Sequence, residues 1–348
     1  MRDRRGWLVT LFVVTAGLAV AHWSVIAAET QARFEFVEPH MGSRFRIILY
    51  AADEATAKRA SAAAFRRIAE LDVIMSDYQP TSELMRLCAK AGGEAVPVSP
   101  DLFDVLSRSQ EIAKQTDGAF DVTVGPVVRL WRLSRRTQRL PDPEKLRAAL
   151  ALVGYQNVVL DPKARTVTLK KPGMQLDLGA IAKGFAAEAG QTVLKQQGIK
   201  RALVAASGDI VLTGPPPDAD GWTVGIGAVS EDEKTAPTLR LHDAAVSTSG
   251  DAFQYVEIGG KRYAHIVDPR TGMGMTDIYQ VTVVARDGTT SDALATALVV
   301  MGPEKGLKLV EGMDGVSARF VRKTMAGIEE RVSGRFPPTE AQNPSLKR

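Results

Sequence analysis

Cysteine and histidine are scarce in this sequence. Cys88 is the single cysteine among 348 residues, which excludes an intramolecular disulfide framework and any cysteine-rich metal site. Four histidines occur, and one of them, His22, lies in the N-terminal segment. The remaining three are too few for a histidine-rich transition-metal site. If a metal binds, oxygen ligands and a hard cation such as Mg²⁺ therefore fit better.

Common catalytic motifs and excess charge are also lacking. The sequence has no phosphate loop of the form G-x-x-x-x-G-K-S/T, no G-x-G-x-x-G and no H-E-x-x-H, and it has no G-x-S-x-G. The net charge of +4 is too small and too scattered for a nucleic-acid-binding protein. With 45% hydrophobic and 24% charged residues, the composition is that of an ordinary globular protein and excludes general disorder.

The N-terminal stretch has the layout of a secretory signal peptide. Three arginines within the first five residues precede an uncharged run over residues 6–28, which ends in Ala27-Ala28. We expect residues 1–28 to be cleaved off after Ala27 or Ala28. The alternative is an uncleaved membrane anchor, because the run is just long enough to span a bilayer. Either way we expect a periplasmic or other extracytoplasmic location. Removing three arginines and Asp3 lowers the net charge from +4 to +2, so charge does not identify the partner.

The remainder of the chain shows alternating helix and strand patterns. We expect residues 29–335 to form one interwoven α+β unit, with two lobes as the alternative, and residues 336–348 to be a loose tail. Apolar periodicity and capping residues predict helices over residues 53–75, 99–115, 142–153, 180–197, 291–301 and 304–312. Alternation and turn residues predict strands over residues 34–36, 44–50, 158–160, 167–169, 201–212, 222–227, 238–248, 253–258, 261–267, 278–286, 316–322 and 327–332.

Asp292 and Thr296 stand four residues apart in a stretch predicted to be helical. Side chains at that spacing share one helix face, so both oxygens can meet one hard cation. The competing interpretation is that Ser291 or Asp292 only caps the N-terminus of the helix. The spacing alone leaves both interpretations open.

Residues 176–184 lead from a strand into a helix through small side chains. Small side chains let a ligand approach the backbone, and a helix N-terminus favours phosphate. The alternative is that Gly179 and Gly184 serve only close packing of the helix. The sequence of this segment alone does not separate the two.

Residues 247–251 and 263–272 gather hydroxyls, a histidine, an aspartate and an arginine around turns. Loops that join strands often carry function. The alternatives are that His265 is satisfied within a strand and that residues 268–272 form an ordinary turn.

Residues 76–80 and 118–126 are turn-rich and contain aromatic side chains. Loops of this kind suit a planar ligand. The alternative is ordinary turn chemistry with Phe120 in the core.

Taken together, these segments resemble the ApbE family of flavin transferases. The resemblance runs from about residue 41 to residue 312 and rests on stretches that stand in the order of the family. Any one stretch would be weak evidence, but their combination is specific. The stretches are Met41-Gly42-Ser43, residues 76–84, 117–126, 176–184, 246–251 and 265–272, and residues 292–296 together with Met301-Gly302-Pro303.

The resemblance implies an α+β flavin-transferase fold with mixed, mostly antiparallel sheets and packed helices. It implies FAD as substrate, Mg²⁺ as cofactor, and transfer of the FMN half to a threonine hydroxyl of a partner protein, with release of AMP. Acceptors in this family are typically periplasmic or membrane-associated electron-transfer subunits. This suits an exported enzyme near the inner membrane, and no nucleic-acid partner is expected.

The resemblance also implies roles for individual residues. For Mg²⁺ it implies Asp292, Thr296 and a backbone carbonyl at or beside Ala180. His265 is expected to act in the transfer step, with Asp268 as a nearby candidate. The residues expected in the FAD site are Met41, Tyr78, Glu83, Asp121, Thr123, Lys183, Ser249, Asp251 and His265.

The residue types suit this reaction. A pyrophosphate carries charge that a Mg²⁺ ion can neutralise while it orients the phosphorus. A threonine hydroxyl is a poor nucleophile while protonated, and a positioned histidine or carboxylate can accept its proton. Two other activities remain open, namely hydrolysis of FAD to FMN and AMP, and flavin carriage without turnover. The presence of both Asp292 and Thr296 argues against a carrier, because a carrier needs no catalytic metal.

Two segments differ from the family or look specific to this chain. Where the family often has Gly-Gly-Glu or Gly-Gly-Asp after a strand, this sequence has Ser207-Gly208-Asp209, and a serine adds a side chain where glycine allows backbone freedom. That exchange could alter flavin or acceptor preference. Residues 129–140, with five arginines, are interpreted first as a solvated loop and second as a patch that faces an acceptor or a membrane.

Overall fold

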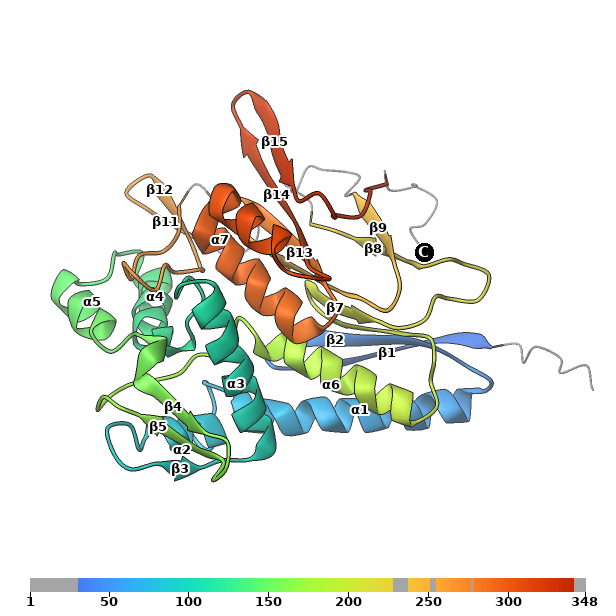
Figure 1. Cartoon of the computed structure of the whole chain (residues 1–348), viewed down its shortest axis with the longest axis horizontal. Helices are drawn as coiled ribbons and strands as arrows, with labels where there is room; N and C mark the ends of the chain where they lie inside the picture. The colour runs from blue at the N-terminus through green and yellow to red at the C-terminus, as the bar shows by residue number, and fades with distance from the viewer. Residues whose placement is uncertain (1–30, 228–236, 251–254, 277, 341–348) are drawn as a thin grey trace, which may run out of the picture. The chain divides into compact units, whose positions relative to one another are not determined.

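A computed structural model describes residues 31–227, 237–250, 255–276 and 278–340 (Figure 1). These residues belong to the unit that begins at Gln31. The segment predicted to be a signal peptide, Asp251 and most of the predicted tail lie outside the described residues. Within the described part of the chain, no helix combines the length and the apolar character needed to cross a membrane.

Antiparallel pairing builds the central sheet, as the sequence resemblance implied. Within the described residues the sheet has the strand order β1-β2-β6-β7-β10-β13-β14-β15, and every neighbouring pair is antiparallel. The α+β fold class is therefore confirmed. The strands are β1 (Ala32–His40), β2 (Ser43–Ala51), β6 (Ala202–Ala206), β7 (Asp209–Leu212), β10 (Ala245–Ser249), β13 (Gln280–Ala285), β14 (Ser317–Thr324) and β15 (Gly327–Val332).

Helices cover one face of this sheet. Figure 1 shows α1 (Glu54–Met75), α6 (Ala182–Gln196) and α7 (Gly288–Glu311) along that face, with α1 against α6 and α6 against α7. Strand residues that point toward these helices, such as Val204 and Val283, are fully buried in the main core. The alternation of side chains along a strand explains why the neighbouring residues face the other way.

The opposite face of the sheet is covered by the antiparallel pair of β8 (Trp222–Gly225) and β9 (Thr238–Leu241). Leu203 and Val284, which alternate with the residues of the main core, pack here with Trp222. Its central strands, such as β6 and β13, are therefore buried on both sides, whereas β1 and β15 at its edges are largely exposed.

Smaller elements surround the chain segments that line the functional cavity. They include α2 (Glu83–Cys88), α3 (Pro100–Gln115), the short helix η1 (Val122–Val124), α4 (Gly125–Thr137), α5 (Pro143–Leu150) and the short helix η2 (Tyr155–Asn157). They also include a sheet of β3 (Val96–Pro97), β4 (Val158–Asp161) and β5 (Thr166–Leu169), and the hairpin β11 (Tyr255–Ile258) with β12 (Lys261–Ala264).

The interpretation of residues 129–140 as a solvated loop is wrong, because most of them continue α4. Val127, Trp131 and Ser134 fall on one helix face and are buried. The Trp131 indole donates a hydrogen bond of 2.8 Å to the carbonyl of Gly272. Four of the five arginines occupy other positions of the helix and Arg139 follows its end, which is why the segment appears solvated in the sequence.

Two predicted strands are each divided into two. The stretch 201–212 folds as β6 and β7 around a two-residue turn, Ser207-Gly208, in which Ser207 has a φ of 58°. The stretch 238–248 folds as β9 and β10 in different sheets, with Asp243 at a φ of 45° between them. A residue with left-handed backbone conformation changes the direction of the chain. The sequence pattern did not identify Ser207 or Asp243 as such a position.

Candidate active site

A cavity of about 1030 Å³ brings together segments that are far apart in the sequence. Its walls come from the β1–β2 turn, the loop after α1, residues 119–124, the segment before α6, the β6–β7 turn, β10, the segment after β12, and α7. The predicted site residues that line it are Met41, Tyr78, Asp121, Ala180, Lys183, Ser249, His265, Asp292 and Thr296.

Asp292 lies in the first turns of α7, but it does not cap that helix. Asp287 is the N-cap, and its Oδ1 accepts a hydrogen bond of 2.8 Å from the backbone N–H of Thr290. The interpretation of Ser291 or Asp292 as the cap is therefore wrong. Because capping falls to Asp287, the Asp292 carboxylate is available to the cavity.

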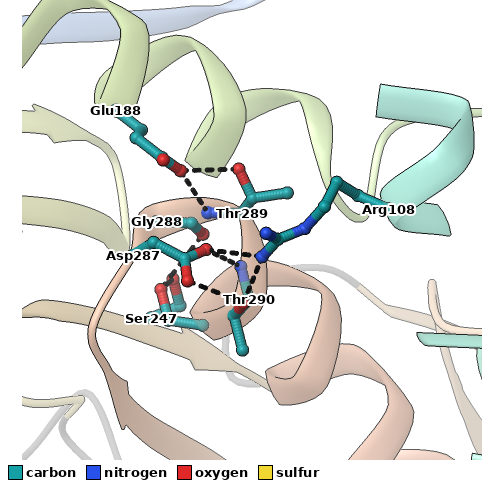
Figure 2. Close-up of polar contacts among 8 residues, drawn as sticks. Arg108, Glu188, Ser247, Asp287, Gly288, Thr289 and Thr290 are labelled. Carbon is teal, nitrogen blue, oxygen red and sulfur yellow. Dashed lines mark hydrogen bonds and ion pairs between the residues drawn. The ribbon is translucent and has the colours of Figure 1, made fainter. Parts of the chain in front are cut away.

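Contacts from two other helices hold the N-terminus of α7 in place (Figure 2). Arg108 of α3 donates hydrogen bonds to Asp287 Oδ1 at 3.0 Å and to Thr290 Oγ1 at 2.7 Å. Glu188 of α6 accepts a hydrogen bond of 2.7 Å from Thr289 Oγ1. These bonds anchor the turn that precedes Asp292 to both neighbouring helices.

A close crossing of α6 and α7 brings the backbone to Asp292. A Cβ atom built on Gly184 would lie 2.1 Å from the carbonyl oxygen of Gly288, and one built on Gly288 would lie 2.5 Å from that of Gly184. Neither position has room for a side chain. At this crossing the Gly184 N–H donates a hydrogen bond of 2.9 Å to Asp292 Oδ2. The close-packing interpretation of Gly184 is thus confirmed, and the packing serves the site.

The cavity wall at Asp292 carries more negative than positive charge. Asp292 is 2% exposed, and burial, reinforced by the neighbouring Asp209 and opposed by Lys183, raises its pKa to about 7. Lys183 forms an ion pair with Asp209. Burial by itself lowers the pKa of Lys183, but the charges of Asp209 and Asp292 outweigh it and raise that pKa above its ordinary value. Two carboxylates thus share one ammonium group.

Residues with oxygen atoms suitable for a hard cation line the cavity together with Asp292. Thr296 lies one helical turn beyond Asp292, and its Oγ1 is 3.3 Å from Ser249 Oγ. Ala180 lines the same cavity. The described residues hold no cluster of three or more histidine, cysteine, aspartate or glutamate side chains placed to bind a metal. The donor set is therefore one carboxylate with hydroxyl and carbonyl oxygens, and together with the excess negative charge it fits Mg²⁺.

Tyr78 and Asp77 form another part of the wall. Tyr78 is 73% exposed although it lines the cavity, so its ring is accessible to a planar ligand. The Arg132 guanidinium lies 4.3 Å from the centroid of that ring. The same guanidinium forms ion pairs with Asp77 and with Asp177.

Asp121 lines the cavity, whereas Thr123 is not among the lining residues. Burial raises the pKa of Asp121, although hydrogen bonds from Thr123 and from the Tyr155 N–H oppose that rise. Thr123 Oγ1 donates to Asp121 Oδ1 at 2.6 Å and accepts from the Gly154 N–H at 2.7 Å. Thr123 therefore orients Asp121 and joins its loop to residues 154–155.

Glu83 is also outside the lining set, and Met41 is within it. Glu83 Oε1 accepts a hydrogen bond of 2.6 Å from the N–H of Ser99, the residue that caps α3. Met41 occupies the two-residue turn between β1 and β2 with a φ of 50°. Its N–H donates to Asp72 Oδ2 at 2.8 Å, which offsets part of the strain of that conformation.

His265 lines the cavity directly after β12, whereas Asp268 does not. The Asp268 carboxylate accepts hydrogen bonds from the backbone N–H and the guanidinium of Arg270, at 2.8 to 2.9 Å. Its backbone carbonyl accepts from the Gly272 N–H at 2.8 Å. The turn interpretation of residues 268–272 is thus confirmed, and Asp268 stabilises the turn beside His265.

The cavity residues that were not recognised as site residues in the sequence include Arg132, Asp177 and Asp209. Asp177 lies in one of the stretches that carry the family resemblance, and Asp209 lies in the segment that departs from it. Arg132 was assigned to a solvated segment. The buried positions Val127, Trp131 and Ser134, three or four residues apart, are the signal that could have placed it on a helix.

The fold and the cavity define an α+β protein with a large binding site that is lined by both polar and apolar residues and has an acidic wall suited to a hard cation. The profile of the ApbE family matches residues 41–320. A protein named FAD:protein FMN transferase from Klebsiella pneumoniae (strain 342) is 34% identical over 285 residues, 81% of this chain and 87% of that protein. A protein of the same name from Vibrio cholerae serotype O1 is 34% identical over 277 residues, which cover 78% of this chain and 82% of that protein.

Solved structures agree with these sequence relationships. The flavin transferase ApbE from Vibrio cholerae superposes with a TM-score of 0.80 at 31% identity, covering 88% of this chain and 99% of that one. The apo flavinyl transferase ApbE from Pseudomonas stutzeri gives a TM-score of 0.76 at 30% identity, with coverages of 87% and 95%. The chain belongs to the ApbE family.

Proposed function

We propose that this protein transfers FMN from FAD to a threonine hydroxyl of an extracytoplasmic redox protein, in a Mg²⁺-dependent reaction that releases AMP. The class of enzyme, a transferase of the FAD:protein FMN type, follows from its family and its named relatives. The observation that carries the finer proposal is the buried wall at Asp292, where two carboxylates share one lysine inside a cavity of about 1030 Å³.

In this proposal the wall at Asp292 receives the pyrophosphate of FAD. Asp292, Thr296 and the Ala180 carbonyl would hold Mg²⁺, which supplies charge neutralisation at the phosphate oxygens when bound. Lys183 lines the same wall and keeps its proton at neutral pH because of the neighbouring carboxylates. Its ammonium group, which is paired with Asp209, would then also contact a phosphate oxygen as a cation.

The flavin ring is assigned to the part of the cavity beside Tyr78. An exposed aromatic ring with a guanidinium close by is a platform on which a planar heterocycle can stack. We also propose that FAD contacts three further residues that line the cavity, namely Met41, Asp121 and Ser249. Glu83 and Thr123 support the site from outside its wall, through Ser99 and Asp121.

His265 is proposed to accept the proton of the attacking threonine hydroxyl. It lines the cavity and is partly exposed there, so an acceptor peptide can reach it. Asp268 acts on the reaction through the turn that it stabilises. Attack by the threonine oxygen forms a bond to the FMN phosphorus, the bond to AMP breaks, and the threonine proton passes to the imidazole.

The acceptor and the location are also proposals. A basic start followed by an uncharged run over residues 6–28 supports export to the periplasm, with an anchor at the inner membrane as the alternative. An exported flavin transferase needs an exported acceptor. We therefore propose a periplasmic or membrane-associated electron-transfer subunit that presents a threonine.

The test incubates the protein with FAD, Mg²⁺ and candidate acceptors, followed by mass spectrometry of the acceptors. The expected result is a mass increase corresponding to FMN on a threonine, together with release of AMP. Release of free FMN without an acceptor would indicate a hydrolase instead. Retention of FAD without release of AMP would indicate a carrier, and either outcome would overturn the proposal.

A further inference from the structure

Arg132 joins two segments that both line the cavity. Its Nη1 donates a hydrogen bond of 2.5 Å to Asp77 Oδ2, and its Nη2 donates one of 2.8 Å to Asp177 Oδ2. Asp77 belongs to the loop that follows α1, and Asp177 to the segment that leads into α6. The planar fork of a guanidinium can bond two carboxylates at once, which an ammonium group on a flexible stem cannot do with the same geometry.

The segment held through Asp177 leads to the proposed cation ligand. Asp177 Oδ1 accepts a hydrogen bond of 2.8 Å from the Gly179 N–H, and Gly179 directly precedes Ala180. The Asp177 N–H in turn donates to the carbonyl of Val122 at 2.8 Å. The position of the Ala180 carbonyl therefore depends on where Asp177 is held.

The loop held through Asp77 presents the aromatic platform. Tyr78 follows Asp77, and its ring lies 4.3 Å from the Arg132 guanidinium. A cation near the face of a tyrosine ring is attractive, so the guanidinium holds the ring as well as the carboxylate beside it. Arg132 thus touches both the ring platform and the acid that orients the segment at Ala180.

Arg132 also balances charge in this part of the wall. The side chains of Asp77 and Asp177 are only 15% and 10% exposed. Burial, followed by the charge of Asp77, raises the pKa of Asp177, and Arg132 opposes that rise. Without the arginine, two nearly buried carboxylates would repel each other across the wall.

We propose that Arg132 is a positioning residue of the flavin site. It holds the Tyr78 ring at a fixed position relative to the Ala180 carbonyl, where the phosphate groups and the cation are proposed to bind. The inference rests on the proposed function, since it takes FAD as the ligand. Arg132 acts through Asp77, Asp177 and Tyr78. FAD spans both ends of the cavity, so it binds tightly only when the two loops keep their relative position.

The test measures the Kd for FAD of the full chain in the presence of Mg²⁺, well below the unfolding temperature of each variant. Arg132→Met is expected to raise the Kd about tenfold or more, as for other coupled charge networks, and to raise KM for FAD more than it lowers kcat. Arg136→Met, on the same helix but exposed and outside the lining set, is the matched control, with a Kd within about twofold of wild type.

The double variant Asp77→Asn with Arg132→Met separates positioning from direct contact. It removes the repulsion between the carboxylates, so it is expected to recover about half of the lost affinity on a logarithmic scale. No recovery would mean that the repulsion between the two carboxylates does not displace the loops, and it would overturn the charge-balancing part of the inference. Should Arg132→Met not fold, Arg132→Lys keeps the charge without the fork, and a Kd raised about threefold or more is expected.

The outcomes distinguish this inference from the proposed function. Wild-type protein that binds no FAD would overturn both. Wild-type protein that binds FAD, with an Arg132→Met variant whose Kd stays within about twofold of it, would overturn the inference alone. A merely structural role would lower the unfolding temperature of Arg132→Met and leave the Kd and KM for FAD unchanged.

Discussion

The close crossing of α6 and α7 at Gly184 leads to a quantitative prediction for the free energy of unfolding of Gly184→Ala. In Gly184→Ala, the new Cβ would lie 2.1 Å from the Gly288 carbonyl oxygen and 2.7 Å from Asp292 Cβ. Real Cβ atoms essentially never approach closer than 3.0 Å, so the helices must separate by about 1 Å, a gap that already removes a quarter to a half of a dispersion contact. Both obstructing atoms belong to rigid parts of α7, so local adjustment is not available.

The expected loss of stability has two parts. Overpacking in a close-packed core costs about 1 to 3 kcal/mol. Loss of the hydrogen bond from the Gly184 N–H to the buried Asp292 carboxylate costs about 1.5 to 3 kcal/mol more, because the acceptor is charged. We therefore expect Gly184→Ala to lower the free energy of unfolding by about 3 to 5 kcal/mol. Displacement of Asp292 should lower FAD turnover in the protein that remains folded.

The measurement is urea unfolding followed by tryptophan fluorescence, with the slope m compared between variants. Gly190→Ala on the same helix is the matched control. Its Cβ would meet Ile68 Cδ1 at 3.0 Å, which is the movable end of a side chain, and alanine gains about 0.5 to 1 kcal/mol over glycine inside a helix. We expect this control within about 1 kcal/mol of wild type. Equal unfolding midpoints and turnover for Gly184→Ala and wild type would refute the reasoning.

Three further predictions concern the cavity and the core. Asp292→Asn keeps the size of the side chain and should abolish Mg²⁺-dependent release of AMP from FAD; unchanged release would refute the metal assignment. His265→Ala should bind FAD normally but transfer FMN slowly, measured by titration and acceptor labelling, and equal loss of both would assign His265 to binding. Burial raises the pKa of the Cys88 thiol above its ordinary value. The folded protein therefore holds this proton more tightly, so the stability that Cys88 contributes should decline as the pH rises through the folded pKa, and Cys88→Ala should lack that decline in urea unfolding at high pH.

Local patterns in the sequence predicted much of the fold. Residues 53–75 carry apolar positions at helical spacing and form α1, over Glu54–Met75. The break predicted between residues 301 and 304 appears inside α7, where Gly302 has a φ of 75° beside Pro303. These features depend on neighbouring residues, so periodicity and proline chemistry suffice to find them. The order of the strands in the sheet depends on contacts between distant segments, which no local pattern encodes.

The site could be predicted from the sequence where the spacing of residues within one element places their side chains together. The spacing of Asp292 and Thr296 predicted that both face one place, and both line the cavity. The N-cap at Asp287 is itself a local feature, because its side chain accepts a hydrogen bond from the Thr290 N–H three residues later; the predicted helix began too late to include it. The role of Arg132 was not predictable from local patterns, since its carboxylate partners lie 55 and 45 residues away in the sequence.

The charge excess at Asp292 is stabilised by the scaffold more than by the charged residues themselves. Burying two carboxylates beside one ammonium group costs free energy, and the raised pKa of Asp292 reflects that cost. The cap at Asp287, its bond from Arg108 and the backbone contact at Gly184 prevent α7 from moving away to relieve the repulsion. With a pKa of about 7, Asp292 takes up a proton near neutral pH and relieves part of this cost. Under the proposed function a bound Mg²⁺ would displace that proton and compensate the carboxylate instead, because a metal ligand must be deprotonated.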